Sequence, residues 1–122
     1  SDAKWFVCGA VHTRDDGHTF FNPMYPRWDD KIMLEPGYNF IGGVSVTAIK
    51  KEVNVRYDSE LRMLLDVDVY YQNVLHYGMP LFYRDTLIVN RVRDNDTLMA
   101  EVSEEEIEEE FQYCFKKHGI SR

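Results

Sequence analysis

The stretch 58–78, DSELRMLLDVDVYYQNVLHYG, constrains the fold of this chain most, because two carboxylates stand in its middle among leucines, valines and tyrosines. If a helix begins at Leu61, Asp66 and Asp68 lie on opposite faces of it. If Asp66 is instead the N-cap, 61–65 is an extended segment that leads into the helix. We prefer the second interpretation, which leaves Asp66 ionised at the positive end of a helix dipole and able to accept a proton.

The alternative without chemistry is that Asp66 is only a cap and Asp68 only a charge in the first turn. In either case the helix ends near Tyr77, because Gly78 is a C-cap and Pro80 prevents continuation. The sequence therefore predicts one helix whose start carries a candidate proton acceptor.

Four short stretches rich in β-forming residues predict strands, and turn residues bound them. Gly42 and Gly43 stand at the entrance of one strand, where they let the backbone bend sharply or approach a ligand closely. A tight turn at Arg84 and Asp85 joins two of the others. The expected strands are 4–11, 44–49, 81–83 and 86–92.

Between residues 14 and 38 regular periodicity is lost, and prolines, glycines and aromatic residues are interleaved. A loop of this length in a compact domain is usually functional or disordered, and the aromatic residues argue against disorder. We expect a surface lid or binding loop; the alternative is that its aromatic side chains only pin the loop to the core. These aromatic residues are Phe20, Phe21, Tyr25, Trp28 and Tyr38.

Residues 103–119 predict a second helix by local rules. Ser103 and Glu106 form a capping box, Gly119 ends the helix, and acids fill its first turn as lysines fill its last. One apolar stripe runs along it, so we expect its glutamates to be a solvated face without chemistry. The predicted fold is α+β, with a mixed sheet of about four or five strands, two main helices and a long aromatic loop.

At 122 residues the chain is long enough for a single domain with its own core. Its net charge of -7 is concentrated in 101–110, which holds seven of the 21 acids, so the charge does not describe the whole surface. Because the chain has no basic stripe, we expect no nucleic-acid partner.

Cys8 and Cys114 lie far apart without a CxxC pair, which fits buried thiols in a reducing compartment, and we expect a cytoplasmic protein. No apolar run approaches the ~18 residues of a transmembrane segment, and there is no signal peptide. The chain begins SDAKWFVCGA without an initiator Met, so we expect a fragment or trimmed product of a longer protein.

Two pairs of charged residues are candidates for ligand binding. Asp66 and Asp68 spell a DxD, but on a helix they point apart and cannot chelate one ion. Arg91 and Arg93 alternate near the end of a predicted strand, so both guanidiniums can project from one face. They can bind a phosphate there, or pair with surface acids.

Three segments stand in a familiar order: WFVCGAVHTRDDG; P-x-W-D-D with GYNFIGGVS; and LLDVDVYYQNVLHYGMP before a strand that ends in Arg91-Val92-Arg93. This order resembles the C-terminal half of family 2 glycosyltransferases of the GT-A fold, from about Lys4 to the final helix. The resemblance implies part of an inverting enzyme that transfers a sugar from a nucleotide-sugar to an acceptor hydroxyl. In that family a D-x-D/E-x-Y segment carries the catalytic base, and Asp66 occupies its position.

The resemblance implies roles for other residues as well. Arg91 and Arg93 would bind the donor diphosphate, although Arg93 stands where the family usually has His. Val44 and Gln72 are further departures, at positions where Pro and a basic residue are frequent. The implied substrate-binding residues are Trp28, Asp29, Asp30, Gly42, Gly43, Ser45 and Asp68.

The resemblance also implies partners outside the chain. The nucleotide-binding half, with its metal-binding carboxylates, would precede Lys4, so a divalent Mn or Mg ion would have most of its ligands there, and we assign no metal ligand in this chain. The substrates would be a nucleotide-sugar donor and a glycan or other hydroxyl acceptor. Without that half the sheet would expose an edge or an apolar face, which we expect a homo-oligomer to cover.

Two other functions remain open. One is a truncated, non-catalytic module that binds a glycan or a protein, or that serves in assembly. The other is a metal-dependent hydrolase with ligands from one loop, although the spacing of these residues matches no structural zinc site. The candidate ligands are His12, Asp15, Asp16 and His18.

Overall fold

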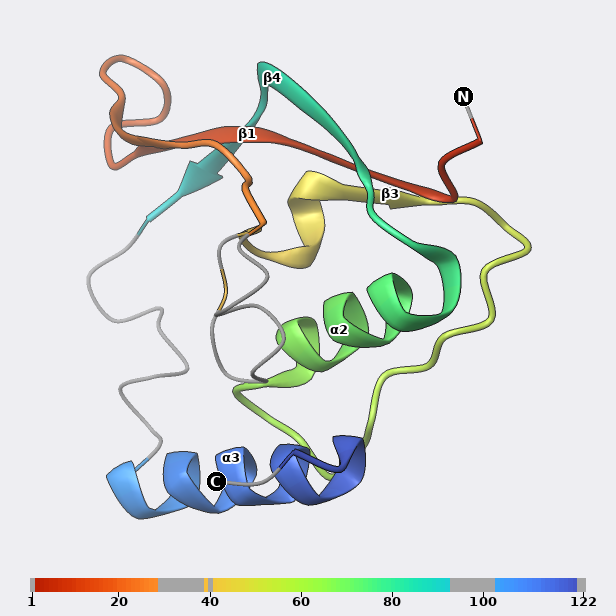
Figure 1. The fold of residues 1–122 in the computed structure, drawn as a ribbon. Helices are drawn as coiled ribbons and strands as arrows, with labels where there is room; N and C mark the ends of the chain where they lie inside the picture. The colour runs from red at the N-terminus through yellow and green to blue at the C-terminus, as the bar shows by residue number, and fades with distance from the viewer. Residues whose placement is uncertain (1, 29–38, 40, 93–102, 121–122) are drawn as a thin grey trace.

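The computed structural model describes residues 2–28, 39, 41–92 and 103–120 (Figure 1). Four strands form one mixed sheet, and two α-helices lie below it in the view of Figure 1. This confirms the predicted α+β class, with four strands and two helices. The elements are β1 (Trp5–Thr13), β2 (Phe21–Met24), the 3-10 helix η1 (Val44–Val46), β3 (Thr47–Ile49), α2 (Leu65–Tyr77), β4 (Leu81–Arg91) and α3 (Glu104–His118).

Strand β1 is the centre of the sheet, because each of the other three strands pairs with it. β4 runs parallel to β1, from the Phe6–Leu81 pair to the Thr13–Arg91 pair. β2 and β3 are antiparallel to β1 and share its other edge, β2 beside the C-terminal half and β3 beside the N-terminal half. The strand predicted at 4–11 is thus confirmed, and its apolar residues are buried as a central strand requires.

The other three predicted strands, 44–49, 81–83 and 86–92, take a different form. Residues 44–46 make the 3-10 helix η1, and only 47–49 form a strand. Residues 81–91 form one continuous strand, so the turn predicted at Arg84 and Asp85 is wrong. The register of β4 against β1 shifts at this point, because extra residues of β4 bulge out of the ladder and bend the strand without ending it.

The segment 14–38 is not wholly irregular, because 21–24 form β2. Pro23 argues against a strand in the sequence, because proline cannot donate a backbone hydrogen bond. It fits here because β2 pairs with β1 and lies at the edge of the sheet. The aromatic side chains form no single cluster in the described part of the segment. Phe20 is exposed, Phe21 contacts His12, Tyr25 lies over Gly9 and Trp28 packs against the core.

Two hydrophobic clusters hold the layers together. The larger joins the sheet to α2, and in it the rings of Trp5 and Tyr70 stack with centroids 5.8 Å apart. The smaller joins the segment before α2 to α3 through Leu61, Leu64 and Cys114. Figure 1 shows the resulting order of layers, with α2 between the sheet and α3.

Most of the predicted helix ends are confirmed. Gly78 follows α2 with φ 84° and donates its backbone N–H to Val74 O. Ser103 caps α3 by accepting the backbone N–H of Glu106, and Gly119 ends α3 in the left-handed conformation. Among the described residues, neither helix is long and apolar enough to cross a membrane. Both cysteines are buried thiols, as expected.

Candidate functional site

Asp66 lies in the first turn of α2, and its side chain is partly buried. The prediction that Asp66 is the N-cap is wrong, because the helix begins at Leu65 and Leu64 occupies the cap position without a side-chain hydrogen bond. Burial raises the pKa of the Asp66 carboxyl. The carboxylate is therefore not used in capping, and it is a stronger base than an exposed aspartate.

The capping role belongs to Glu110 of α3. Its Oε1 accepts the backbone N–H groups of Arg62, Met63 and Leu64 at 2.9, 2.9 and 3.1 Å. The carboxylate thus binds the backbone N–H of the cap residue Leu64 and of the two residues before it, at the positive end of the helix dipole. The α2 start, and Asp66 with it, is thus positioned by a residue of the last helix.

Glu110 corrects the expectation that the α3 glutamates form a solvated face. Its neighbours Glu108 and Glu109 are exposed, whereas Glu110 is buried. The signal in the sequence was its spacing: Glu110 lies three residues after Ile107 and four before Cys114, on the apolar stripe itself. An acid on that stripe needs buried donors.

Tyr57 and Tyr70 lie near enough to Asp66 to be affected by its charge, and Tyr70 contacts Gly42. Burial, and then the negative charge of Asp66, raise the pKa of both Tyr57 and Tyr70. The Tyr70 hydroxyl donates to the backbone oxygen of Gly42 at 2.9 Å. Gly42 has φ 117°, a conformation that disfavours any residue with a side chain. The structure thus brings Gly42 to the helix that carries Asp66.

Gly43 is the N-cap of η1, and Ser45 lies within it. Gly43 precedes this helix and its oxygen accepts the backbone N–H of Val46, while Ser45 is exposed. Ser45 lines a hollow of about 450 Å³ between β1, η1–β3 and β4, which we call the sheet hollow. Most of its lining is apolar, including Phe6 and Leu87.

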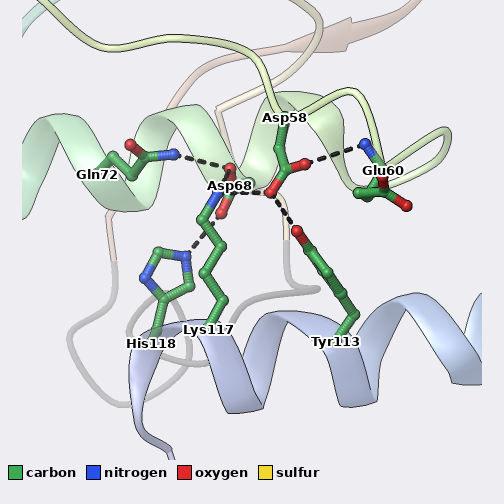
Figure 2. Close-up of polar contacts among 7 residues, drawn as sticks. All are labelled: Asp58, Glu60, Asp68, Gln72, Tyr113, Lys117 and His118. Atoms are coloured by element: carbon green, nitrogen blue, oxygen red, sulfur yellow. Dashed lines mark hydrogen bonds and ion pairs between the residues drawn. The ribbon is translucent and has the colours of Figure 1, made fainter.

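Asp68 is placed differently from Asp66, since it has no exposed surface. Figure 2 shows its side chain directed toward Lys117 and His118 of α3. Its Oδ1 lies 2.6 Å from His118 Nε2, and its Oδ2 accepts hydrogen bonds from Lys117 Nζ and Gln72 Nε2, both at 2.8 Å. Burial by itself raises the pKa of Asp68, but the hydrogen bonds from His118 and Lys117 hold it below its usual value. Asp68 therefore joins α2 to α3 and is not open to a substrate.

Asp58 extends this network to the segment before α2. Its Oδ2 accepts hydrogen bonds from Tyr113 and Lys117 at 2.8 and 2.9 Å, and its Oδ1 accepts the backbone N–H of Glu60 at 2.9 Å (Figure 2). The hydrogen bond from Lys117 is the main reason that the pKa of Asp58 falls to about 2. The local sequence does not indicate this network, because compensation of the helix dipole alone accounts for a basic last turn in α3.

Arg91 ends β4 and forms an exposed ion pair with Asp16, with Nη2 3.1 Å from Oδ1. Trp28 packs against the larger hydrophobic cluster. The predictions for Asp29, Asp30 and Arg93 lie outside the described residues. Asp66 is thus part of α2, and Gly42 contacts the same helix through Tyr70. Arg91 lies at the C-terminal end of β4.

The proposed metal ligands of the 12–18 loop do not form a metal site. Both Asp15 oxygens accept hydrogen bonds within the loop, including the Thr19 hydroxyl at 2.5 Å, and His12 Nδ1 lies 3.0 Å from Asn22 O. Over the described ranges no three His, Cys, Asp or Glu side chains are grouped so as to hold a metal ion. No group among the described residues is therefore assigned to the Mn or Mg ion that the resemblance implies, whose ligands would mostly precede Lys4.

Comparisons with protein-family models, with curated protein sequences and with solved structures find no match for this chain.

Proposed function

We propose that this chain is the acceptor-side half of an inverting glycosyltransferase and that Asp66 is its general base. The observation that carries the proposal is the setting of Asp66: a partly buried carboxylate of raised pKa, not used as a cap, on a helix whose Tyr70 holds Gly42. The order of motifs that resembles family 2 glycosyltransferases supports the same residue.

In the proposed reaction the acceptor hydroxyl attacks the anomeric carbon of a nucleotide-sugar. Its oxygen forms the new glycosidic bond, the bond from that carbon to the diphosphate oxygen breaks, and Asp66 takes the hydroxyl proton. Attack opposite the leaving group inverts the configuration. Such general-base assistance contributes typically ~10²–10⁴-fold, and alignment of the substrates contributes further.

The leaving diphosphate must be neutralised, and we assign this to Arg91 and Arg93. The contact of Arg91 with Asp16 is exposed, and such ion pairs contribute about 1 kcal/mol or less, so a phosphate can replace the carboxylate. Arg93 is assigned from the strand alternation in the sequence alone. No step is assigned to a metal ion, because none of the described residues is assigned as a metal ligand.

The proposed acceptor pocket includes Gly42, Gly43 and Ser45, with Trp28 as an aromatic surface for a sugar ring. We leave Asp68 out of it, because every contact of that carboxylate is with the interior of the protein. A divalent ion, if the enzyme uses one, belongs to residues outside those described.

The test is transfer of a radiolabelled sugar from a panel of nucleotide-sugars, in a protein that contains this chain together with the nucleotide-binding half. We expect Asp66→Asn to abolish transfer and to leave nucleotide-sugar binding unchanged. Glu105→Gln removes one exposed acid from α3 and serves as the matched control, with unchanged rates. Transfer within tenfold of the unsubstituted protein would exclude Asp66 as the base.

A second candidate, an assembly module, is favoured by the surface of β4. Tyr83, Leu87 and Val89 are exposed on this strand, beside the apolar sheet hollow. Exposed apolar surface of this kind often contacts another protein, here a second copy of the chain. Light scattering should find an oligomer that Leu87→Lys dissociates, whereas Leu75→Lys on the exposed side of α2 should not; a monomer at high concentration would contradict the idea.

A further inference from the structure

We propose that Glu110 is a positioning residue for Asp66: by accepting the backbone N–H groups that precede α2, it keeps the Asp66 side chain from serving as the helix cap. Two acids therefore compete for one task, and the packing of α3 decides which of them performs it. The competition itself involves no substrate. Its meaning for catalysis rests on the proposed role of Asp66 as general base.

The start of α2 has no side-chain acceptor in its own cap position. Leu64 stands there with φ -98° and ψ 17°, whereas cap residues usually have an extended backbone and a side chain that accepts a hydrogen bond. The acceptor comes from α3 instead, since Glu110 Oε1 binds the successive N–H groups of residues 62–64. Successive N–H groups that converge on one oxygen form a concavity for an anion. The first turn of α2 thus follows a bend that an acid of another helix supports.

The position of Glu110 is fixed by the packing of its own helix. Glu110 is 8% exposed, and Cys114, one turn later on α3, lies in the smaller hydrophobic cluster with Leu61 and Leu64. These two leucines flank the bend whose N–H groups Glu110 accepts. Burial of apolar surface therefore holds the carboxylate and its donors together, as long as α3 is packed against the segment before α2.

Asp66 is the nearest residue that can replace Glu110 in this task. Leu64 and Leu65 offer no side-chain acceptor, whereas aspartate is among the residues preferred at the N-cap. Burial alone raises the pKa of Asp66, and the described part of the chain provides no hydrogen bond that lowers it. The carboxylate is therefore available for capping whenever the bend loses its support.

One backbone N–H distinguishes the two arrangements. The Asp68 N–H donates to Leu64 O at 2.9 Å and closes the first turn of α2. If α2 began two residues later, with Asp66 as its cap, this bond would be lost and the N–H of Asp68 or Val69 would bind the Asp66 carboxylate. Asp66 would then be held against the end of the helix. Withdrawal of Glu110 should therefore remove the proposed base without any change to Asp66 itself.

The test compares two variants at position 110 by NMR titration of the Asp66 carboxyl carbon in the isotopically labelled chain. Glu110→Gln keeps an oxygen at the same reach and loses the charge, whereas Glu110→Asp keeps the charge and is one methylene shorter. We expect the pKa of Asp66 to stay above its usual value in the Gln variant. In the Asp variant it should fall below that value, because N–H hydrogen bonds and the helix dipole favour the ionised form.

Two outcomes of this titration would overturn the proposal. If the negative charge at position 110 acted on Asp66 directly, the Gln variant would lower its pKa and the Asp variant would not. An unchanged pKa in both variants would mean that the two caps do not compete. Glu109→Gln, on the exposed side of α3, is the matched control and should change nothing. Tyr57 and Tyr70, whose hydroxyls respond to the charge of Asp66, stay neutral while carboxyl groups titrate.

Amide hydrogen exchange gives a second measurement that needs no variant at position 110. Asp66→Ala removes the alternative cap and should leave the Asp68 N–H as protected as before, because Glu110 supports the bend. Faster exchange there would show that Asp66 already caps α2 and would contradict the proposal. Sugar transfer by the full enzyme tests the proposed function separately. If Glu110→Asp lowers the pKa of Asp66 and leaves transfer unchanged, the caps compete as proposed but Asp66 is not the base.

Discussion

His118 Nε2 lies 2.6 Å from Asp68 Oδ1, and this contact joins the last turn of α3 to the first turn of α2. Asp68 has no exposed surface, so its charge is compensated only inside the protein, by the ammonium group of Lys117 and by hydrogen bonds with His118 and Gln72. Buried charges of this kind are stable only in their partners' presence. One carboxylate of α2 thus binds two side chains in the last turn of α3.

Replacement of Asp68 by Asn should lower the free energy of unfolding by about 3 kcal/mol, because Lys117 then keeps only Asp58 as a counter-charge and His118 Nε2 loses its carboxylate partner. Urea denaturation at pH 7 measures this. Asp16→Asn is the matched control, since its ion pair with Arg91 is exposed and should cost less than about 1 kcal/mol. Equal losses in the two variants would contradict the assigned role of Asp68.

Replacement of Glu110 by Ala should destabilise the protein by about 2–4 kcal/mol, because the backbone N–H groups of residues 62–64 lose their acceptor. Glu110→Gln keeps an oxygen at this position and should lose about half as much. Glu109→Ala, on the exposed side of α3, should be near neutral. Amide hydrogen exchange provides the local measurement, with faster exchange expected at residues 62–64 in the Ala variant alone.

Replacement of Asp66 by Asn should stabilise the protein at neutral pH, by about 0.5–1 kcal/mol. Burial raises the pKa of Asp66 in the folded state above its unfolded value, so its stability contribution is fully present at low pH and is lost as the pH rises through the folded pKa. The gain in the variant should therefore appear above that pKa and vanish below the unfolded one. Thermal melts from pH 3 to pH 8 measure it, and a variant that is less stable at every pH would show that the carboxylate is held by favourable contacts.

Replacement of Gly9 by Ala should cost about 1–3 kcal/mol, because the new methyl group would overlap the Tyr25 ring and press on the Asp85 backbone. Gly43→Ala is the control: Gly43 has φ -73° and a Cβ there would meet nothing within 4 Å, so its melting temperature should be unchanged. The shift of Tyr25 should also be visible in its aromatic NMR signals. An unchanged melting temperature for Gly9→Ala would mean that Tyr25 moves freely.

The helix ends that depend only on neighbouring residues could be predicted from the sequence. The caps of α3 at Ser103 and Gly119, and the end of α2 at Gly78, each depend on residues within one turn, and the structure has them as predicted. The apolar run of β1 was equally clear, because a strand buried on both faces has few polar residues.

The features that sequence did not reveal depend on residues distant in the chain. The start of α2 is set by Glu110, more than 40 residues later, so local preference placed the cap at Asp66 instead. The bulge in β4 follows from its pairing with β1, whereas Arg84 and Asp85 alone resemble a turn. Helical spacing predicts that Asp66 and Asp68 point apart, but only the structure shows that Asp68 contacts Lys117 and His118 of α3.

The pairing of β4 with β1 also governs how the chain acquires its structure. During synthesis β1 emerges well before its parallel partner β4, which begins only at Leu81. Contacts between such distant segments form slowly, because the chain between them loses conformational entropy before the contacts can stabilise the fold. A ribosome-bound nascent chain should therefore expose the apolar β1 until β4 has left the exit tunnel, and this is the interval in which chaperones would bind it.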